Sequence, residues 1–465
     1  MKAKIYKSFF GVAVVLFLLT SCTDFLDIKP YGKTIPKTTD EFAALVNSMI
    51  GGIDGSIGGE SWAGSLLFTT SDNSSFEEAS DNMETNLTEM PLGSFLRTYI
   101  GQMSSSDYYE NLYEVIARCN MVFDDYSDGK DTREGQDLIG TCYALRGVAY
   151  YQLLRMYCAP ALSDDEKLGV PIVTTFDMEA KPIRSTMDET VSQAESDLKA
   201  ALNCHIQDDM YRFNDDVIKG YLARLYFWAG RFEEAKAMAD DVLSRHPLLK
   251  GDAYKEMITS HNGLTGNMLI RGDRLAKDYF STQNQYLQAR PLSIRYVKLF
   301  AEKDRDIRYK FFFNSKRKST KAYISSLRSA ELAFISMESA YHLGKEAEAL
   351  QMLNDFRATR ISDYTPYTMS TLPPVDTTEL IKTDCTGKPL TPLMQAILNE
   401  RRKELYLEGD RFFELKRNGR PEFWVTSKGL KYTNYKYMYT FPLPANDIQL
   451  NPGLIQNPGY TEVVY

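Results

Sequence analysis

The chain is 465 residues long, and its 43% hydrophobic and 25% charged content is ordinary for a globular protein with a large core. Its formal net charge is −8, and removing the three lysines of the amino-terminal segment makes it −11 (−8 − 3). This mildly acidic balance argues against a nucleic-acid partner. No two of its six cysteines form a C-x-x-C pair, and its four histidines show no H-x-x-x-H spacing. The sequence therefore predicts no metal site and no cofactor.

The amino terminus has the parts of an export signal. Three lysines precede an apolar run at residues 9–19, and Ser21 and Cys22 follow it. A membrane-spanning helix needs about 20 apolar residues, so this run is too short to be a stable anchor. A small residue before a cysteine, with leucine at −3, is similar to a bacterial lipoprotein signal. We expect residues 1–21 to be a signal peptide and Cys22 to carry lipid; an ordinary secretory signal with a chance cysteine is the alternative.

The mature chain is expected to begin with a lipidated tether over residues 22–39, followed by a single domain over 40–465. Thr39-Asp40-Glu41 is typical of a helix start, which predicts a first helix over residues 39–49. Residues 51–90 are rich in Gly, Ser, Asn and Asp. We expect long loops there, as part of a loop-rich insertion over about 51–106.

Helical periodicity then dominates the sequence to about residue 245. Apolar side chains recur every three or four residues, which predicts helices over 109–123, 138–156 and 186–202. The third stretch begins with Thr186 and Glu189, at the spacing of a capping box. Three cysteines in this part of the chain are interpreted as small core residues and not as disulfide partners: Cys119, Cys142 and Cys158.

Residues 220–243 and 330–357 resemble each other. In each stretch a glycine ends one helix and an alanine follows five residues later: Gly230 with Ala235, and Gly344 with Ala349. Glycine permits a tight turn and alanine lets two helices approach closely, as in a tetratricopeptide hairpin. Any helical hairpin uses the same turn chemistry, so that alternative stays open. The two copies start 110 residues apart (330 − 220), so we expect an insertion at about 251–325 to interrupt the array.

The carboxyl-terminal part adds a helical block over 390–416. The tetratricopeptide-like helices are thus expected over about 107–245 and 328–417, with an irregular tail over 418–465. Within this tail, the apolar and aromatic residues 436–443 predict a short strand or an extended arm. The predicted fold is mainly all-α: an interrupted array of tetratricopeptide-like helix pairs with long irregular loop insertions and few short strands.

Four signatures occur in order along the chain. They are Cys22 with Asp24-Phe25-Leu26-Asp27, the block 328–360 with Asn354 and Arg357, the run 400–417 that starts Glu400-Arg401-Arg402-Lys403-Glu404, and the tail with Asn457-Pro458-Gly459-Tyr460. Together they resemble the SusD/RagB family of outer-membrane nutrient-uptake lipoproteins. The resemblance implies the interrupted helix-pair fold and lipid anchoring in the outer membrane, facing the exterior. It also implies a TonB-dependent, SusC-like barrel as partner, and binding of oligosaccharides, or in some branches peptides, without cleavage.

Glu400 and Glu404 lie one helical turn apart, a spacing that suggests a pair of carboxylates for acid–base chemistry. The interpretation we favour is a helix packed in the core, with its charges paired to neighbouring side chains. The sequence has no nucleophile elbow, metal motif or phosphate loop, so no catalytic residue is predicted and the protein is expected not to be an enzyme. A glycosidase and a helical scaffold that binds only proteins remain the alternatives.

A site for a neutral glycan needs an aromatic platform with polar side chains around it. Trp62 lies in a polar loop, and the resemblance places ligand contacts near Asp72, Asn73, Tyr99 and Tyr108. Further candidates in the large insertion are Tyr279, Tyr286 and Arg290. The other two tryptophans are expected to be packed: Trp228 in the core and Trp424 beneath the carboxyl-terminal helices.

Overall fold

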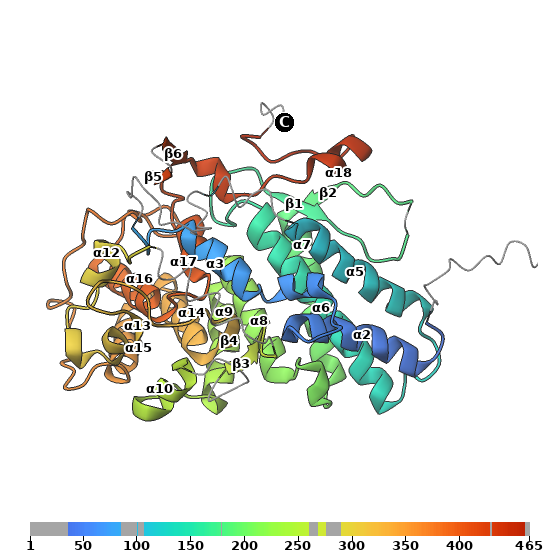
Figure 1. The fold of residues 1–465 in the computed structure, drawn as a ribbon, viewed down its shortest axis with the longest axis horizontal. Coiled ribbons are helices and arrows are strands. Elements are labelled where there is room, and N and C mark those ends of the chain that lie inside the picture. The colour runs from blue at the N-terminus through green and yellow to red at the C-terminus, as the bar shows by residue number, and fades with distance from the viewer. Residues whose placement is uncertain are drawn as a thin grey trace, which may run out of the picture.

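The computed structural model describes residues 36–84, 100, 107–177, 179–259, 268–275, 290–427 and 430–460, which form a mainly helical body (Figure 1). Its α-helices are α2 (Thr39–Asp54), α3 (Thr70–Glu78), α5 (Tyr108–Asp125), α6 (Arg133–Tyr157), α7 (Met187–Cys204), α8 (Asp215–Trp228), α9 (Phe232–Arg245), α10 (Gly251–Thr259), α12 (Ile294–Lys298), α13 (Ile307–Phe312), α14 (Ser329–His342), α15 (Glu346–Ala358), α16 (Pro392–Glu404), α17 (Asp410–Arg417) and α18 (Ala445–Leu450). Short 3₁₀ helices are η1 (Ser61–Leu66), η2 (Asp209–Tyr211), η3 (Lys303–Arg305) and η4 (Lys436–Tyr439). The strands are β1 (Leu168–Pro171), β2 (Arg184–Thr186), β3 (Met268–Arg271), β4 (Ser326–Arg328), β5 (Phe423–Ser427) and β6 (Leu430–Asn434).

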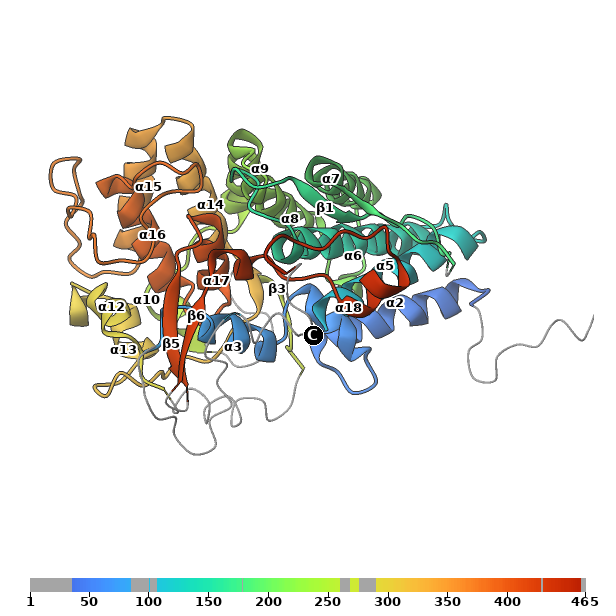
Figure 2. The same cartoon turned by 90° about the horizontal axis from the view of Figure 1, so that it is seen from above.

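The helices α5 to α9 form a row in which each packs on the one before it (Figure 2). The chain then leaves the row through α10, α12 and α13. It returns with α14, which packs directly on α9, and α15 and α16 pack in turn on α14. The expected insertion therefore interrupts the array in sequence but not in space, and the predicted fold class is confirmed.

Two tight turns make the helix pairs α8–α9 and α14–α15. Gly230 and Gly344 end the first helix of each pair with φ angles of 76° and 75°, which glycine adopts without the strain a side chain would add. Ala235 and Ala349 are fully buried at the start of the second helices. The two hairpins predicted from the sequence therefore form.

The segment after the first helix differs from the expected long loops. Helix α2 continues to Asp54, where Gly55 ends it in the left-handed conformation with φ of 67°. Thr69 and Asp72 then form a capping box that starts α3, a short helix. The expectation of loops is thus wrong over 51–54, 61–66 and 70–78, because Ser, Thr and Asp favour helix starts as well as turns.

Three hydrophobic clusters hold the described residues together. The largest joins α2, α3, α5 to α9 and α17, the second lies under α10, α12 and α13, and the third fills the space between α14, α15 and α16. Three cysteines are buried in the largest cluster as free thiols, as predicted: Cys119, Cys142 and Cys158.

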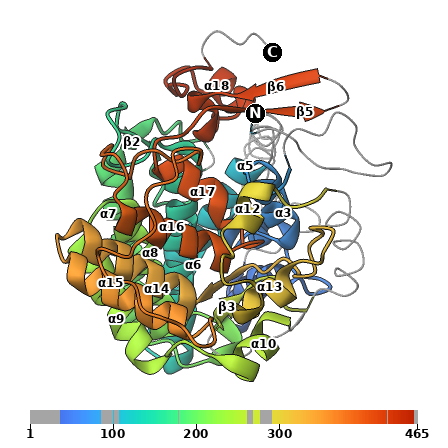
Figure 3. The same cartoon turned by 90° about the vertical axis from the view of Figure 1, so that its left-hand side faces the viewer.

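The strands are peripheral and form three antiparallel pairs, β1–β2, β3–β4 and β5–β6. The β5–β6 hairpin pairs Phe423 with Asn434 and Ser427 with Leu430, and it lies with α18 at one end of the molecule, beyond the helices (Figure 3). Among the residues that the structure describes, no helix combines the length and the apolar character needed to cross a membrane.

Candidate functional site

Three of the residues expected to contact ligand lie around α3, where Asn73 and Tyr108 are buried and Asp72 is partly buried. Asn73 is 1% exposed and donates a hydrogen bond to the Ile324 carbonyl at 3.1 Å. The carboxylate of Asp72 accepts from the backbone and hydroxyl of Thr69, both at 2.8 Å, as the cap of α3. Tyr108 is buried and its ring stacks on Phe76, with centroids 5.7 Å apart. In the structure these three side chains pack or cap α3.

A buried acid on the same helix makes a testable contribution to stability. Glu77 is fully buried, and burial raises its pKa to about 7, an effect that the hydrogen bond from Asn82 only partly offsets. The folded protein therefore holds this proton more tightly than the unfolded chain. The contribution of protonated Glu77 to the free energy of unfolding is fully present below the unfolded pKa of about 4.5. It is lost as the pH rises through the folded pKa, so the free energy of unfolding falls by about 2–3 kcal/mol between pH 5 and pH 8.

We expect Glu77→Gln to remove this loss, because an amide cannot ionise. Urea unfolding midpoints at pH 5 and pH 8 measure the difference for the wild type and the variant. Glu348→Gln is the control, since the side chain of Glu348 is 43% exposed and should leave the pH profile unchanged. An equal loss of stability in wild type and Glu77→Gln would contradict the prediction.

The remaining predicted residues are dispersed. Trp62 is partly buried against the largest hydrophobic cluster, and its indole N–H donates to Glu60 Oε2 at 3.0 Å. Arg290 is only 3% exposed, and burial lowers its pKa against the opposing effect of nearby carboxylates. The other predicted residues, Cys22, Tyr99, Tyr279 and Tyr286, lie outside the residues that the structure describes.

The two further tryptophans differ in their placement. Trp228 is 6% exposed and belongs to the largest hydrophobic cluster, as predicted. The expectation that Trp424 packs beneath the carboxyl-terminal helices is wrong, because it is 42% exposed on β5. Cross-strand pairing fixes its backbone, and the ammonium of Lys431 lies 4.9 Å from the centre of its ring. In a strand with one buried face, every second side chain points to solvent. The sequence around Trp424 does not show which of its side chains take the exposed face.

A hollow of about 310 Å³ lies where the tail crosses the loop that follows α6. Tyr435 and Tyr437 line it, and seven polar residues surround them: Asp165, Glu166, Arg420, Glu422, Lys436, Thr440 and Asn457. Its size is at the lower end for small-molecule sites, and its combination of rings and polar groups suits a ligand with an apolar face and hydroxyl groups.

The two tyrosines form the aromatic surface of the hollow. Their rings are nearly parallel, with an interplanar angle of 8° and centroids 6.1 Å apart. Tyr435 is 46% exposed, so a ligand can reach its ring. The rings of Tyr437 and Tyr460 make an edge-to-face contact, with centroids 5.0 Å apart. The two parallel rings together form an aromatic surface, or platform, in the hollow.

Charged side chains near the platform form ion pairs and hydrogen bonds with their neighbours. Arg420 forms an ion pair with Asp165. Although partial burial favours the neutral acid, hydrogen bonds from Ser163 and Arg420 hold the pKa of Asp165 below its usual value. The Glu422 carboxylate accepts from the backbone N–H of Lys436 at 3.0 Å. Carboxylates ionised at neutral pH accept hydrogen bonds from hydroxyl groups, which is the recognition chemistry a sugar needs.

The last sequence signature has a structural role at this hollow. The Asn457 side chain donates to the Tyr157 and Phe441 carbonyls at 2.9 and 2.6 Å, which ties the tail to the end of α6. Gly459 has φ of 93°, and a Cβ there would lie 2.4 Å from the Tyr437 ring. Asparagine and glycine at these positions therefore allow the tail to close against the platform.

The hollow was not predicted, because residues 436–443 form one apolar and aromatic stretch in the sequence. The structure forms η4 over Lys436–Tyr439, and the expected strand lies one element earlier, as β6. The available signal was the recurrence of tyrosine between polar residues over 432–437. Tyrosine combines an apolar ring with a polar hydroxyl, so such a segment indicates a partly exposed surface.

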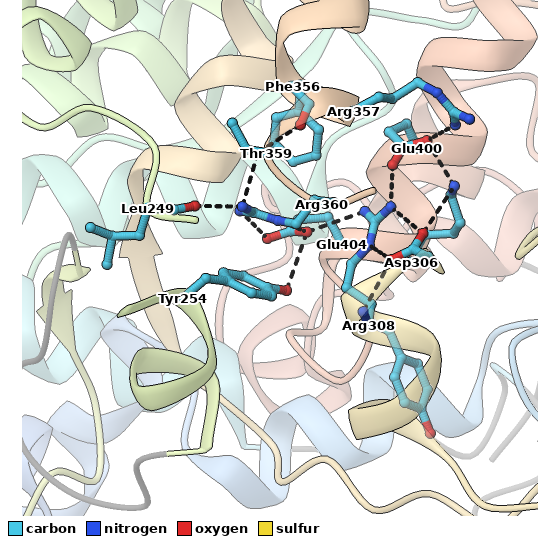
Figure 4. A network of polar contacts seen from close by, with 12 residues as sticks. Leu249, Tyr254, Asp306, Arg308, Phe356, Arg357, Thr359, Arg360, Glu400 and Glu404 are labelled. Carbon is cyan, nitrogen blue, oxygen red and sulfur yellow. Dashed lines mark hydrogen bonds and ion pairs between the residues drawn. The ribbon is translucent and has the colours of Figure 1, made fainter. Parts of the chain in front are cut away.

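The pair of glutamates singled out in the sequence lies in a buried ionic network (Figure 4). Glu404 is fully buried and accepts from Arg360 at 2.9 and 3.0 Å, from Arg328 at 2.8 Å and from Arg308 at 3.2 Å. Burial alone would raise its pKa, but the guanidinium groups outweigh burial and hold the pKa of Glu404 well below its usual value.

Glu400 occupies the neighbouring part of the same network. It forms ion pairs with Arg308, with Arg357 at 2.5 Å and with Lys403 at 2.8 Å. These cations overcome the effect of burial and lower the pKa of Glu400 well below its usual value. A carboxylate held ionised and enclosed by cations has no proton to donate as a general acid. The interpretation of a packed helix with paired charges is confirmed.

Comparisons with known proteins agree with this architecture. A family model described as starch-binding, associating with the outer membrane, matches residues 24–227, and a model described as the SusD family matches residues 303–460. Similar solved structures include a SusD superfamily protein from Bacteroides thetaiotaomicron (19% identity, TM-score 0.68, covering 90% of this chain and 100% of that one). A putative sugar binding protein from Bacteroides vulgatus is 21% identical, with a TM-score of 0.66 and coverage of 92% and 100%.

A laminarin binding SusD-like protein is also similar, with 16% identity, a TM-score of 0.60 and coverage of 92% of this chain and 100% of that one. A comparison with curated proteins gave no match. The two family models match both the amino-terminal and the carboxyl-terminal parts of the chain, and the solved structures share its fold along nearly the whole length. The chain belongs to the SusD/RagB family.

Proposed function

We propose that this chain is a cell-surface lipoprotein of the outer membrane that binds oligosaccharides without cleaving them and delivers them to a TonB-dependent, SusC-like transporter. The description of the matching family model supports glycan binding and outer-membrane association. The structural likeness to a laminarin binding protein supports a glycan as the ligand class. Binding of peptide-derived nutrients for delivery to the same transporter is the second candidate, because peptides also suit aromatic platforms with charged surroundings.

The observation that carries the glycan assignment is the exposed Tyr435–Tyr437 stack in the tail hollow. A sugar ring presents a flat apolar face, and covering roughly 100 Å² of it contributes about 2.5 kcal/mol at ~25 cal/mol/Å². Two or three contacts of this kind with hydrogen bonds give millimolar to micromolar affinity. The other proposed contacts are Trp62, Tyr99, Tyr279 and Tyr286. The family resemblance suggests Tyr99, and the other three are candidates as aromatic residues of a polar loop or of the large insertion.

We expect Tyr435→Ala to weaken oligosaccharide binding by roughly 30-fold, because it removes about 2 kcal/mol of ring contact. Isothermal calorimetry of the purified full-length protein in detergent, against a panel of oligosaccharides and a panel of peptides, measures the change. Trp424→Ala is the matched control, since Trp424 is similarly exposed but does not line the hollow.

The possible results test the position of the binding site and the class of ligand separately. Oligosaccharide binding that Tyr435→Ala leaves unchanged would move the site away from the hollow but keep the glycan proposal. Peptide binding without any oligosaccharide binding would reject the glycan proposal in favour of the peptide alternative.

Product analysis after long incubation tests the absence of cleavage, and released shorter oligosaccharides would contradict it. Co-purification of a TonB-dependent barrel tests the proposed delivery step.

A further inference from the structure

Three side chains with metal-binding atoms meet at the end of α14, away from the tail hollow. Glu338 and His342 lie one turn apart on this helix, and Cys385 comes from the loop that precedes α16. His342 Nε2 is 3.4 Å from Cys385 Sγ and 3.6 Å from Glu338 Oε1. One ligand atom from each residue lies within 4.8 Å of the other two. This grouping was not visible in the sequence, because Cys385 is 43 residues beyond His342.

The three side chains are buried and held in place. The side chains of Glu338 and His342 are 0% and 5% exposed, and Cys385 is 6% exposed. The ring of Phe232 stacks on the His342 ring at 4.5 Å with an angle of 20°, which fixes the imidazole. Asp384 accepts from the backbone N–H groups of Thr386 and Lys388, which sets the turn that carries the cysteine.

Glu338 also has an oxygen without a partner. Its Oε1 accepts from Arg417 at 2.5 Å. Its Oε2 is buried and has no hydrogen-bond partner among the described residues. A buried carboxylate oxygen left in this way is destabilising unless a cation or a donor reaches it. The site thus offers a thiol, an imidazole and a free carboxylate oxygen.

We propose that Glu338, His342 and Cys385 bind a zinc ion. A tetrahedral zinc with bonds of about 2.3 Å to sulfur and 2.05 Å to nitrogen and oxygen separates its S and N ligands by about 3.6 Å and its N and O ligands by about 3.3 Å. The observed 3.4 Å between Cys385 Sγ and His342 Nε2 is close to the first separation, and one carboxylate oxygen of Glu338 lies within 4.8 Å of both atoms. Arg417 on the other carboxylate oxygen is the outer-shell partner that orients a ligating carboxylate.

Binding releases one proton: the Cys385 thiol gives up its proton to solvent and the thiolate sulfur donates an electron pair to Zn²⁺, without any change of oxidation state. The fourth position is left for water. The ion joins the loop at residues 383–389 to the last turn of α14, so we assign it a structural role, bracing the connection between α15 and α16.

The test titrates Zn²⁺ alone into the purified full-length protein in detergent, after treatment with a chelator. We expect one tight equivalent of zinc per chain by metal analysis, and a rise in the unfolding temperature with zinc concentration. Co²⁺ in place of zinc is expected to show thiolate-to-metal charge-transfer absorption, which reports the cysteine ligand. Absence of a tight equivalent, or of the absorption band, overturns the proposal.

Two ligand variants and one control complete the test. Cys385→Ser and His342→Gln are each expected to weaken zinc binding by roughly 100-fold or more, since loss of an outer-shell partner alone costs 10–100-fold. Cys204→Ser is the control, because Cys204 is a half-buried free thiol outside the cluster. If one of the two ligand variants does not fold, the zinc affinity of the other variant tests the proposal. Unchanged zinc affinity in the folded variants overturns the proposal.

Discussion

Glu404→Gln is expected to destabilise the protein by about 3–5 kcal/mol, because it breaks a buried ionic network by removing one charge. Glu404 is fully buried and forms ion pairs with three guanidinium groups, and it also accepts a hydrogen bond from Tyr254 at 3.3 Å. Glutamine keeps the size of the side chain but removes its charge and presents an amide N–H₂ to donors. Arg308, Arg328 and Arg360 are then left with too few acceptors in a site that water does not reach.

Urea unfolding followed by circular dichroism measures this loss as a shift in the midpoint. Glu234→Gln is the matched control, because Glu234 pairs with Arg231 on the surface and its side chain is 45% exposed. An exposed pair contributes at most about 1 kcal/mol, so the control should shift the midpoint only slightly. Equal shifts in the two variants would mean that the network around Glu404 is not a main source of stability.

Cys22→Ala is expected to release the protein from the membrane almost completely. If Cys22 carries acyl chains, each buried CH₂ contributes about 0.8 kcal/mol of membrane affinity, and two or more chains hold a protein firmly where one does not. Alanine cannot be acylated, and the apolar run at residues 9–19 is too short to anchor the chain in its place. The variant should therefore move from the membrane fraction to the soluble fraction.

Cell fractionation and metabolic labelling with an alkyne fatty acid measure the two parts of this prediction. The wild type should be labelled and sediment with membranes, and Cys22→Ala should be neither. Cys204→Ala is the control, because its cysteine lies within the folded domain and should affect neither readout. A Cys22→Ala protein that stays firmly membrane-bound would contradict lipid anchoring through this residue.

Much of the helical array could be predicted from the sequence, because its signals are local. The capping box at Thr186 and Glu189 starts α7 as predicted, since both hydrogen bonds involve residues three apart. The turns at Gly230 and Gly344 depend on backbone freedom, which a single residue type reports. The other helices of the array were predicted from periodic apolar residues, because the buried face of a helix repeats every three or four residues in the sequence.

The sites could not be predicted in the same way, because they depend on segments that are distant in sequence. The tail hollow joins Asp165 with Tyr435 across 270 residues (435 − 165). Asn73 was expected to contact ligand, but its side chain is buried and donates to the backbone carbonyl of Ile324. The exposure of Trp424 depends on which face of the β5–β6 hairpin meets the core. In each case the deciding contact is tertiary, and no local pattern encodes it.

The packing of α14 directly on α9 has a consequence for how the chain folds. Helices α5 to α9 follow one another closely and can associate early, but the outer face of α9 stays uncovered until Ser329 arrives, 84 residues after Arg245 (329 − 245). Closing so long a segment costs about 4 kcal/mol of chain entropy before the contacts form. We therefore expect a folding intermediate with α9 exposed, and this face is the surface that a chaperone would need to shield.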